Sequence, residues 1–392
     1  MKKKLAIITT HPIQYNAPLF ELLHQRKNID LHVFYTWGES VLENKYDPGF
    51  KAIITWDIPL LQGYPYTFLE NTASRKGSDH FRGINNPGII KAIKAYQPDI
   101  ILVYGWSFKS HFNVLRYFKR RLPILFRGDS TLLDESGGVK TIIRRLFLKW
   151  IYRHISAALF TGKSNYDYFK QAGLKDKQLV FVPHTIDNTR FSEHLIHSNK
   201  GSMKLREDLG IAAPDFVFLF AGKLEPKKSP GLLLSAFCDA GFDKTVHLVI
   251  AGAGVLGDAL GMQYADDRQI HFTGFINQSL MPELYQAADV VILPSGGPGE
   301  TWGLTINEAL ACSKPVIVSD HCGCAADLVK DGINGYIFKA GNKANLQEKL
   351  QHIYQQRDII SAMGNASKEI IENYSMDIAA TGIETSVMNF GR

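Results

Sequence analysis

The sequence predicts an α/β protein with two Rossmann-like halves, each a parallel β-sheet covered by helices. Short runs of β-branched and aromatic residues alternate with helix-length segments nearly throughout the chain, which is typical of parallel βαβ units. The alternation is interrupted by a polar segment at 188–204 and then resumes. The chain has 392 residues, and two domains of about 150–200 residues each are expected for that length.

The first half begins with an expected strand at 5–9, a loop, and a helix pattern from Asn16, which we expect to be the N-cap. Further strands are expected at 31–36, 99–104, 123–127, 158–161 and 179–182. Residues 37–81 contain scattered aromatic residues without a clear period, so no element is predicted there. We expect an N-terminal domain over 1–190, with a C-terminal helix at about 374–392 packing back on it.

The second half repeats the pattern after the polar segment, which we interpret as a linker. Its strands are expected at 216–221, 247–251, 270–273, 290–293, 315–319 and 336–338, within a domain over 203–372. Ligands of such sheets bind beyond the carboxyl ends of the strands. We therefore expect a site in a cleft between the halves, built from the residues that follow each strand.

Composition excludes some classes of protein and leaves others open. Hydrophobic residues make up 45% of the chain. The chain nevertheless contains no run of about 18 or more apolar residues, which is the length that a membrane-spanning helix needs. The four cysteines are few and lack zinc-ligand spacing, so we expect reduced thiols, a cytoplasmic protein and no metal site. The net charge of +6 suits anionic partners such as a nucleotide diphosphate or an acidic membrane surface. We expect no nucleic-acid partner.

The stretch 294–310 contains the strongest functional signal. A buried-looking strand leads into a Gly/Pro-rich loop with Glu300, and a helix then begins near Thr305, with Glu308 one turn in. A helix start attracts phosphate through its unpaired N–H groups and its dipole. Two carboxylates beside it could accept hydrogen bonds from sugar hydroxyls, which predicts a nucleotide-sugar site. Alternatively, Thr305 and Glu308 form a capping box and Glu300 is a solvated loop acid.

Other strand ends in this half also carry suitable residues. Gly222 and Lys223 follow the strand at 216–221, and Lys223 and Lys228 are cations suited to a diphosphate or to a solvated basic turn. Gly252 opens a tight glycine turn after the next strand, and Phe275 could form the floor of a base pocket.

Several motifs together resemble family 4 glycosyltransferases, the retaining enzymes with the two-domain GT-B fold. The motifs, in order, are Gly222-Lys223-Leu224 with Lys228, Ile250-Ala251-Gly252-Ala253-Gly254, Leu284-Tyr285-Gln286-Ala287-Ala288-Asp289, Glu300 with Glu308, Lys314-Pro315-Val316-Ile317 and Asp331-Gly332-Ile333-Asn334-Gly335. The resemblance covers about residues 203–372 and implies transfer of a hexose-type sugar from a nucleotide-diphosphate sugar.

The resemblance also implies roles for single residues. Glu308 would hold the ribose hydroxyls, Glu300 would contact the donor hexose, and Lys223 and Lys228 would neutralise the diphosphate. The remaining donor-binding residues would be Gly222, Gly252, Phe275, Trp302, Gly303, Leu304 and Thr305. Lys223 replaces a more usual Arg, Ser229 a Gly and Ala253 an acidic residue, which puts the identity of the donor in doubt.

The first half fits the resemblance less closely. His11 and Gln14 follow the first strand, where many relatives have a glycine-rich loop. Both could meet a donor phosphate or an acceptor, and His11 could equally be a turn residue. Asp129 occupies the slot of a histidine near the donor sugar, or caps a helix. Arg127 could bind phosphate or an acidic acceptor.

A basic amphipathic helix is expected within residues 137–154. Its cations are interspersed with Ile, Leu, Phe and Trp; they are Lys140, Arg144, Arg145, Lys149 and Arg153. Such a helix either lies on the inner face of a membrane or presents an ordinary solvated side.

We therefore predict a retaining glycosyltransferase that needs no metal, because no two Asp residues are spaced as Asp-x-Asp. Its acceptor would be a glycan, a lipid-linked molecule or a small molecule, in cell-surface polysaccharide or glycoconjugate synthesis. The alternatives are a catalytically silent nucleotide-sugar-binding protein on the same fold and, with less support, a nicotinamide-dependent oxidoreductase. The oligomeric state is not predicted.

Overall fold

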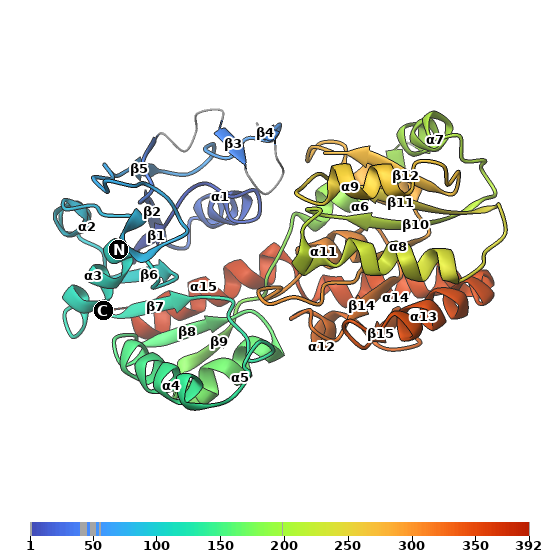
Figure 1. Cartoon of the computed structure of the whole chain (residues 1–392). Coiled ribbons are helices and arrows are strands. Elements are labelled where there is room, and N and C mark those ends of the chain that lie inside the picture. The colour runs from blue at the N-terminus through green and yellow to red at the C-terminus, as the bar shows by residue number, and fades with distance from the viewer. Residues whose placement is uncertain (1, 40–44, 48–51, 55, 198, 392) are drawn as a thin grey trace. The chain divides into compact units, whose positions relative to one another are not determined.

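The computed structural model describes residues 2–391 except 40–44, 48–51, 55 and 198 (Figure 1). The chain forms two compact units. Unit 1 contains Met1–Lys45, Pro59–His184 and Met376–Arg392, and unit 2 contains Tyr46–Ile58 and Thr185–Ser375. Each unit is built on its own parallel sheet, as the alternating sequence pattern predicts.

Unit 1 contains a seven-stranded sheet in the order β5-β2-β1-β6-β7-β8-β9, with parallel pairing throughout. Its strands are β1 (Lys4–Thr9), β2 (Asp30–Tyr35), β5 (Tyr66–Phe68), β6 (Ile100–Tyr104), β7 (Ile124–Arg127), β8 (Ala157–Phe160) and β9 (Leu179–Phe181). The central strands are buried on both faces, which explains their continuous apolar runs. The chain adds strands on one side of β1 first and then crosses to β6, so the switch point of the sheet lies between β1 and β6.

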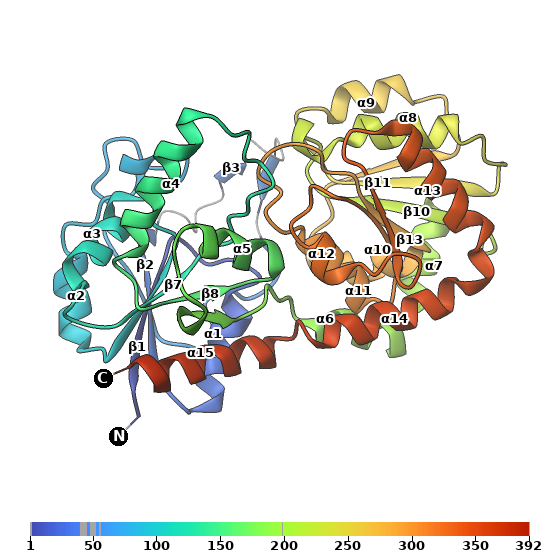
Figure 2. The ribbon, with the colours of Figure 1, turned by 90° about the horizontal axis from the view of Figure 1, so that it is seen from below.

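The helices of unit 1 cover this sheet. They are α1 (Ala17–Arg26), η2 (Phe81–Gly83), α2 (Ile89–Tyr96), α3 (Lys109–Phe118), α4 (Val139–Tyr152), α5 (Lys163–Gln171), η3 (Asp176–Gln178) and α15 (Met376–Phe390). The C-terminal helix α15 lies beside α1 and β9 (Figure 2). Arg26 of α1 donates to Glu384 Oε2 at 3.1 Å, and buried Ala379, Ala380 and Ile383 join the core under β1.

Unit 2 contains a six-stranded parallel sheet in the order β12-β11-β10-β13-β14-β15. Its strands are β10 (Phe216–Ala221), β11 (Val246–Ala251), β12 (Ile270–Gly274), β13 (Val290–Leu293), β14 (Val316–Ser319) and β15 (Gly335–Phe338). Two short strands, β3 (Lys45–Asp47) and β4 (Ala52–Ile54), pair separately. The strands expected from the sequence agree with these bounds to within one residue, whereas β3, β4 and β5 lie in the stretch where no element is predicted.

Helices α6 to α14 and two short 3₁₀ turns surround the second sheet. They are α6 (Asn188–His197), α7 (Asn199–Asp208), η4 (Pro226–Lys228), α8 (Pro230–Asp239), α9 (Gly257–Gln263), α10 (Met281–Ala287), α11 (Leu304–Ala311), α12 (Ala325–Leu328), α13 (Lys343–Gln355), η5 (Arg357–Ile359) and α14 (Ile360–Glu372).

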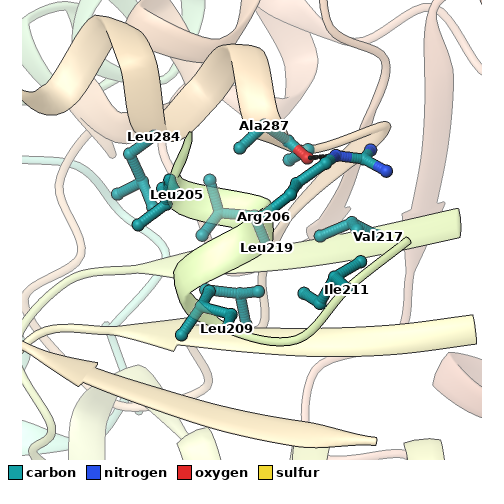
Figure 3. Close-up of a pocket in the computed structure, with 10 residues that line it drawn as sticks. Leu205, Arg206, Leu209, Ile211, Val217, Leu219, Leu284 and Ala287 are labelled. Atoms are coloured by element: carbon teal, nitrogen blue, oxygen red, sulfur yellow. Dashed lines mark hydrogen bonds between the residues drawn. The ribbon is translucent and has the colours of Figure 1, made fainter. Parts of the chain in front are cut away.

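The polar segment at 188–204 is not a linker, contrary to the prediction, because α6 and α7 occupy it. Arg190 of α6 donates to the carbonyl of Gln278 at 2.6 Å, and Arg206 of α7 donates to the carbonyl of Ala287 at 2.8 Å (Figure 3). Leu205 and Leu209 of α7 line an apolar cavity of about 10 Å³ beneath it. A cavity of this size barely holds one water molecule, so it is a packing gap and not a ligand site. Phe191 of α6 is fully buried and Leu205 and Leu209 of α7 line this gap, so a few apolar residues dock the two helices, although Met203 is exposed.

Candidate functional site

The residues singled out in the second half gather at the carboxyl end of its sheet. Strand β10 lies between β11 and β13, and the chain builds outward first through β11 and β12 and then through β13 to β15. The loops after β10 and β13 therefore diverge at the switch point, where open α/β sheets bind ligands. Lys223 and Lys228 lie on the first of these loops and Glu300 on the second.

Glycines allow the strand ends to meet backbone to backbone. Gly222 N donates to the carbonyl of Ala251 at 2.9 Å, and Gly252 N donates to the carbonyl of Gly274 at 2.8 Å. Gly252 has φ +143°, and a Cβ there would lie 1.9 Å from the carbonyl oxygen of Gly222. This position therefore excludes any larger residue. Phe275 directly follows Gly274, at the outer end of this row.

Glu300 and Lys228 form a buried ion pair through Glu300 Oε2 and Lys228 Nζ. The same carboxylate oxygen accepts a hydrogen bond of 2.9 Å from Ser295 Oγ, and Ser295 is fully buried. The Glu300 and Lys228 side chains are 8% and 14% exposed. Glu300 is thus not a solvated loop acid, and the structure brings together the two side chains that the resemblance assigns to the hexose and to the diphosphate.

The loops after β10 and β13 are joined through the residue before Lys228. The carbonyl of Lys227 accepts hydrogen bonds from Gly296 N at 3.1 Å and Gly297 N at 3.2 Å. Ser229, which follows, has φ +50°, a left-handed conformation that glycine adopts at lower cost. This explains why a glycine is usual there in the family that the sequence resembles. Lys223 is partly buried at the start of the same loop.

Glu308 lies inside α11 and is 2% exposed. The helix begins at Leu304, so Thr305 is a helical residue and not the N-cap that the capping box would require. Thr305 Oγ1 donates to the carbonyl of Ala221 at 3.2 Å, and Tyr285 Oη donates to Glu308 Oε2 at 2.7 Å. The capping-box alternative is therefore wrong, and Glu308 is a buried carboxylate oriented by a tyrosine of α10.

Trp302 and Gly303 shape the start of α11. The indole of Trp302 is 3% exposed and its Nε1 donates to Asn307 Oδ1 at 2.8 Å, so the ring is a core side chain. Gly303 is the N-cap with φ +103°, and a Cβ there would lie 2.6 Å from Leu293 Cδ2. Only the backbone of this turn, continuing to Leu304, is thus suited to meet a ligand, in keeping with the predicted role of its amides.

Two residues of this cluster were not predicted as site residues, Tyr285 and Ser295. Tyr285 falls within a motif that carried the resemblance but had no role assigned to it. A tyrosine among the apolar residues of a helix indicates a buried hydroxyl that needs a partner. Ser295 offered no comparable signal, because its partner Glu300 is fixed only by the conformation of the loop.

In unit 1, His11 lies at the end of β1, beside the switch point of that sheet. Its Nδ1 is 2.9 Å from Thr10 Oγ1, and its ring meets the Trp37 ring edge-on at 5.2 Å between centroids. Burial lowers the pKa of His11 to about 4, so the imidazole is neutral at pH 7. Gln14 follows in the same loop, partly buried. Asn16 occupies the N-cap position of α1 as predicted, but its side chain makes no cap hydrogen bond.

Arg127 is a buried anchor of unit 1. Its guanidinium donates to the carbonyls of Val182 at 2.8 Å and Pro183 at 2.9 Å, and the residue is 5% exposed. These contacts tie the end of β7 to the segment after β9 and give the guanidinium a structural role. A contact of Arg127 with an anion stays a prediction. Asp129 is half-exposed, with Oδ2 3.8 Å from Nε2 of His184. The structure thus places a histidine next to the aspartate that takes the family's histidine slot.

Across the described residues, no group of three or more His, Cys, Asp or Glu side chains is arranged to hold a metal ion. At the site, Glu300 pairs with Lys228.

Comparison with known proteins adds evidence on the family of this chain. Residues 202–370 match the family described as glycosyl transferases group 1. The D-inositol 3-phosphate glycosyltransferase of Geodermatophilus obscurus is 29% identical over 205 residues, which is 48% of this chain and 43% of that protein. The alpha-monoglucosyldiacylglycerol synthase of Acholeplasma laidlawii is 29% identical over 290 residues, 68% of this chain and 69% of that protein.

Residues 202–370 are a glycosyl transferases group 1 domain.

This domain contains every donor-side residue named above, from Gly222 to Glu308, whereas the candidates of unit 1 lie outside it. The whole chain shares its fold with Anabaena Alr3699/HepE, whose crystal structure is in complex with UDP and glucose. The TM-score is 0.72 at 19% identity, with 99% of this chain and 100% of that chain covered. The fold is accordingly GT-B, with two Rossmann-like units as predicted. The chain spans less than half the length of the first curated relatives that it matches.

Proposed function

We propose that this chain is a retaining glycosyltransferase of the hexosyltransferase type. It would transfer a hexose-type sugar from a nucleotide-diphosphate sugar to a glycan, a lipid-linked molecule or a small molecule, in the synthesis of a cell-surface polysaccharide or glycoconjugate. The observation that carries this proposal is the pair of buried carboxylates, Glu300 and Glu308, on either side of the start of α11. The group 1 family match of this unit supports it.

The donor would bind with its diphosphate at the start of α11, where the helix dipole and the first N–H groups favour an anion. Glu308, oriented by Tyr285, would accept hydrogen bonds from the ribose hydroxyls, and Glu300 would contact the hexose. Lys228 would turn from Glu300 towards the diphosphate as negative charge develops on the leaving group. Lys223 would add a second positive charge, and no metal would be required.

Retention at the anomeric carbon would follow a front-face route, in which the leaving phosphate oxygen helps to remove the proton of the acceptor hydroxyl. In unit 1, His11, Gln14 and Asp129 would serve the acceptor or the transferred sugar. His11 is neutral at pH 7 and can either donate or accept a hydrogen bond there. A silent nucleotide-sugar-binding protein is the alternative, because an aspartate takes the place of the family's histidine.

The test is a screen of nucleotide sugars by thermal shift, followed by nucleotide release with candidate acceptors. We expect one nucleotide sugar to raise the melting temperature and to be turned over when an acceptor is supplied. Glu308→Gln serves as the site control, since it keeps the shape of the side chain. Binding without nucleotide release for any acceptor would favour the silent protein, and no binding of any nucleotide sugar would overturn the proposal.

A further inference from the structure

Helix α4 of unit 1 presents an apolar stripe to the outside. Its exposed apolar residues have relative exposures between 43% and 72%; they are Val139, Ile142, Ile143, Leu146, Phe147 and Trp150. Their spacing of i, i+3, i+4, i+7, i+8 and i+11 places them on one side of the helix. The opposite side supplies the buried residues Leu148, Ile151 and Tyr152, which pack into the core of unit 1. The helix is therefore apolar on two sides, and only one of them is covered by the rest of the unit.

Aromatic residues extend the stripe from α4 onto the neighbouring elements. The rings of Phe147 and Trp106 lie 5.5 Å apart, those of Trp150 and Phe112 of α3 5.7 Å, and those of Phe112 and Phe81 6.1 Å. Phe81 is itself 44% exposed. The apolar surface thus extends from α4 to η2. We refer to the stripe together with Trp106, Phe112 and Phe81 as the α4 patch. In both views α4 lies at the margin of unit 1 (Figures 1 and 2).

Cations border the stripe on both sides. At 100° per residue, Lys140 and Arg144 fall along one border of the stripe, and Arg145, Lys149 and Arg153 along the other. Residues 139–153 contain no acidic side chain, and of these cations Arg145 pairs with Glu135 at 2.6 Å. Basic residues beside an apolar stripe with Trp and Phe are the pattern of helices that lie in a membrane interface.

We propose that α4 docks this protein on an anionic lipid surface, with the α4 patch entering the headgroup region and the flanking cations against acidic headgroups. The helix would lie in the plane of the surface, because no helix in the described part of the chain is long and apolar enough to cross a membrane. A second copy of the chain is a poorer occupant, since facing patches would bring together two sets of like charges. A protein partner is distinguished by the vesicle test, because Trp, Phe and Arg are enriched at protein interfaces and only Lys is depleted there. The proposal does not depend on the proposed activity, because it concerns a surface of unit 1 and is tested without substrate.

The test uses the full chain and vesicles of two compositions, phosphatidylcholine alone and phosphatidylcholine with 30 mol% phosphatidylglycerol, in a flotation assay. We expect the protein to float with the anionic vesicles, to bind the neutral ones at least about tenfold more weakly, and to be released as salt is raised. The variant Ile143→Ser with Leu146→Ser should weaken binding at least about tenfold. Lys140→Gln with Arg144→Gln should weaken it by about 25-fold, at roughly fivefold for each cation.

Matched controls separate the α4 patch from general effects of charge and hydrophobicity. Met262→Ser with Val255→Ser removes two exposed apolar residues of unit 2, and Lys91→Gln with Lys94→Gln removes two exposed cations of α2. Both should bind like the wild type, and all four variants should keep its melting temperature because every changed side chain is exposed. Equal binding by Ile143→Ser/Leu146→Ser and the wild type would overturn the proposal. So would equal binding to both vesicles, or a dimer without vesicle binding that these substitutions dissociate.

Discussion

Tyr285 Oη donates a hydrogen bond of 2.7 Å to Glu308 Oε2, and both residues are almost completely buried. The bond connects α10 to α11 and fixes the rotamer of a carboxylate at the carboxyl end of the sheet. Burial of a carboxylate is costly for the fold unless hydrogen bonds or a ligand satisfy it, and Tyr285 supplies one such hydrogen bond. Glu308 is thus oriented from α10 and is not a helix cap, and we propose that it binds the donor.

Replacing Glu308 with Gln should therefore weaken nucleotide binding and leave the fold intact. The Gln amide oxygen still accepts the hydrogen bond from Tyr285, but the charge that strengthens bonds to ribose hydroxyls is lost. The loss should be about 1–2 kcal/mol, or roughly 5- to 30-fold in donor affinity. The melting temperature without nucleotide should stay near that of the wild type, and the nucleotide-induced rise should shrink. Tyr285→Phe should lower stability by about 1 kcal/mol and, because Tyr285 only orients Glu308, should weaken nucleotide binding less than Glu308→Gln does. Equal nucleotide-induced rises in wild type and Glu308→Gln would show that Glu308 does not bind the donor.

Lys228→Ala should raise the donor KM and lower kcat. A charged contact to the diphosphate is worth about 1.5–3 kcal/mol and strengthens as the leaving group forms, so kcat/KM should fall roughly 10- to 150-fold. The substitution also leaves Glu300 buried without its ion-pair partner, which should cost up to about 3 kcal/mol of unfolding free energy. Lys227→Ala is the matched control: its side chain is 39% exposed and should matter little to either quantity. An unchanged kcat/KM in folded Lys228→Ala would remove this lysine from the site.

Turnover should persist in excess chelator. The positive charge for the leaving diphosphate would come from Lys223, Lys228 and the start of α11, and these do not depend on an added ion. The measurement is nucleotide release after dialysis against EDTA, with and without added Mg²⁺ or Mn²⁺. A complete loss that Mg²⁺ restores would mean that the diphosphate is neutralised by a metal.

Gly252→Ala should destabilise unit 2 by about 3 kcal/mol or more, because its Cβ would lie 1.9 Å from the carbonyl oxygen of Gly222 at φ +143°. Gly261→Ala is the matched control inside α9, where a Cβ would meet nothing within 4 Å. It should stabilise the protein by roughly 0.5–1 kcal/mol. Urea unfolding of the two variants gives both differences. Similar unfolding midpoints for the two would contradict the close approach of the loops.

Acidification should destabilise unit 1 through two histidines, partly buried His11 and fully buried His111. Burial lowers the pKa of His11 to about 4 and the pKa of His111 to about 4, whereas an unfolded histidine titrates near 6.5. Because the unfolded chain binds the proton first, their contribution to stability is present above pH 6.5 and is lost as the pH falls towards 4. For His111, which is fully buried, the loss between pH 7 and pH 5 should be roughly 2 kcal/mol.

Urea unfolding at pH 7 and pH 5 measures how far the free energy of unfolding falls between the two pH values. This decrease should be smaller for His11→Gln than for the wild type. An equal drop in both proteins would mean that His11 is solvated and titrates normally.

The sequence alone determined the fold class and the place of the candidate donor site. Strands that are buried on both faces of a parallel sheet are continuous apolar runs, so their positions can be predicted without knowledge of any tertiary contact. Strands β10 and β13 have the predicted bounds. The ends of such strands lie at one edge, which is why Gly222, Lys223 and Glu300 could be grouped before the structure was known. The same logic failed for 188–204, where few apolar residues suffice to dock α6 and α7.

The tertiary structure decided which side chains pair. Glu300 meets Lys228 and Ser295, Glu308 meets Tyr285 instead of forming a cap with Thr305, and Arg127 is held by the carbonyls of the segment after β9. Each of these contacts, apart from that with Ser295, joins residues of different elements. The partner depends on loop conformation and burial, and a local sequence pattern does not determine either of these. Likewise, the basic helix pattern at 137–154 left two alternatives open. Only the packing of Leu148 and Ile151 into the core shows that a second apolar side of α4 remains uncovered by unit 1, because exposure is a property of the folded surface.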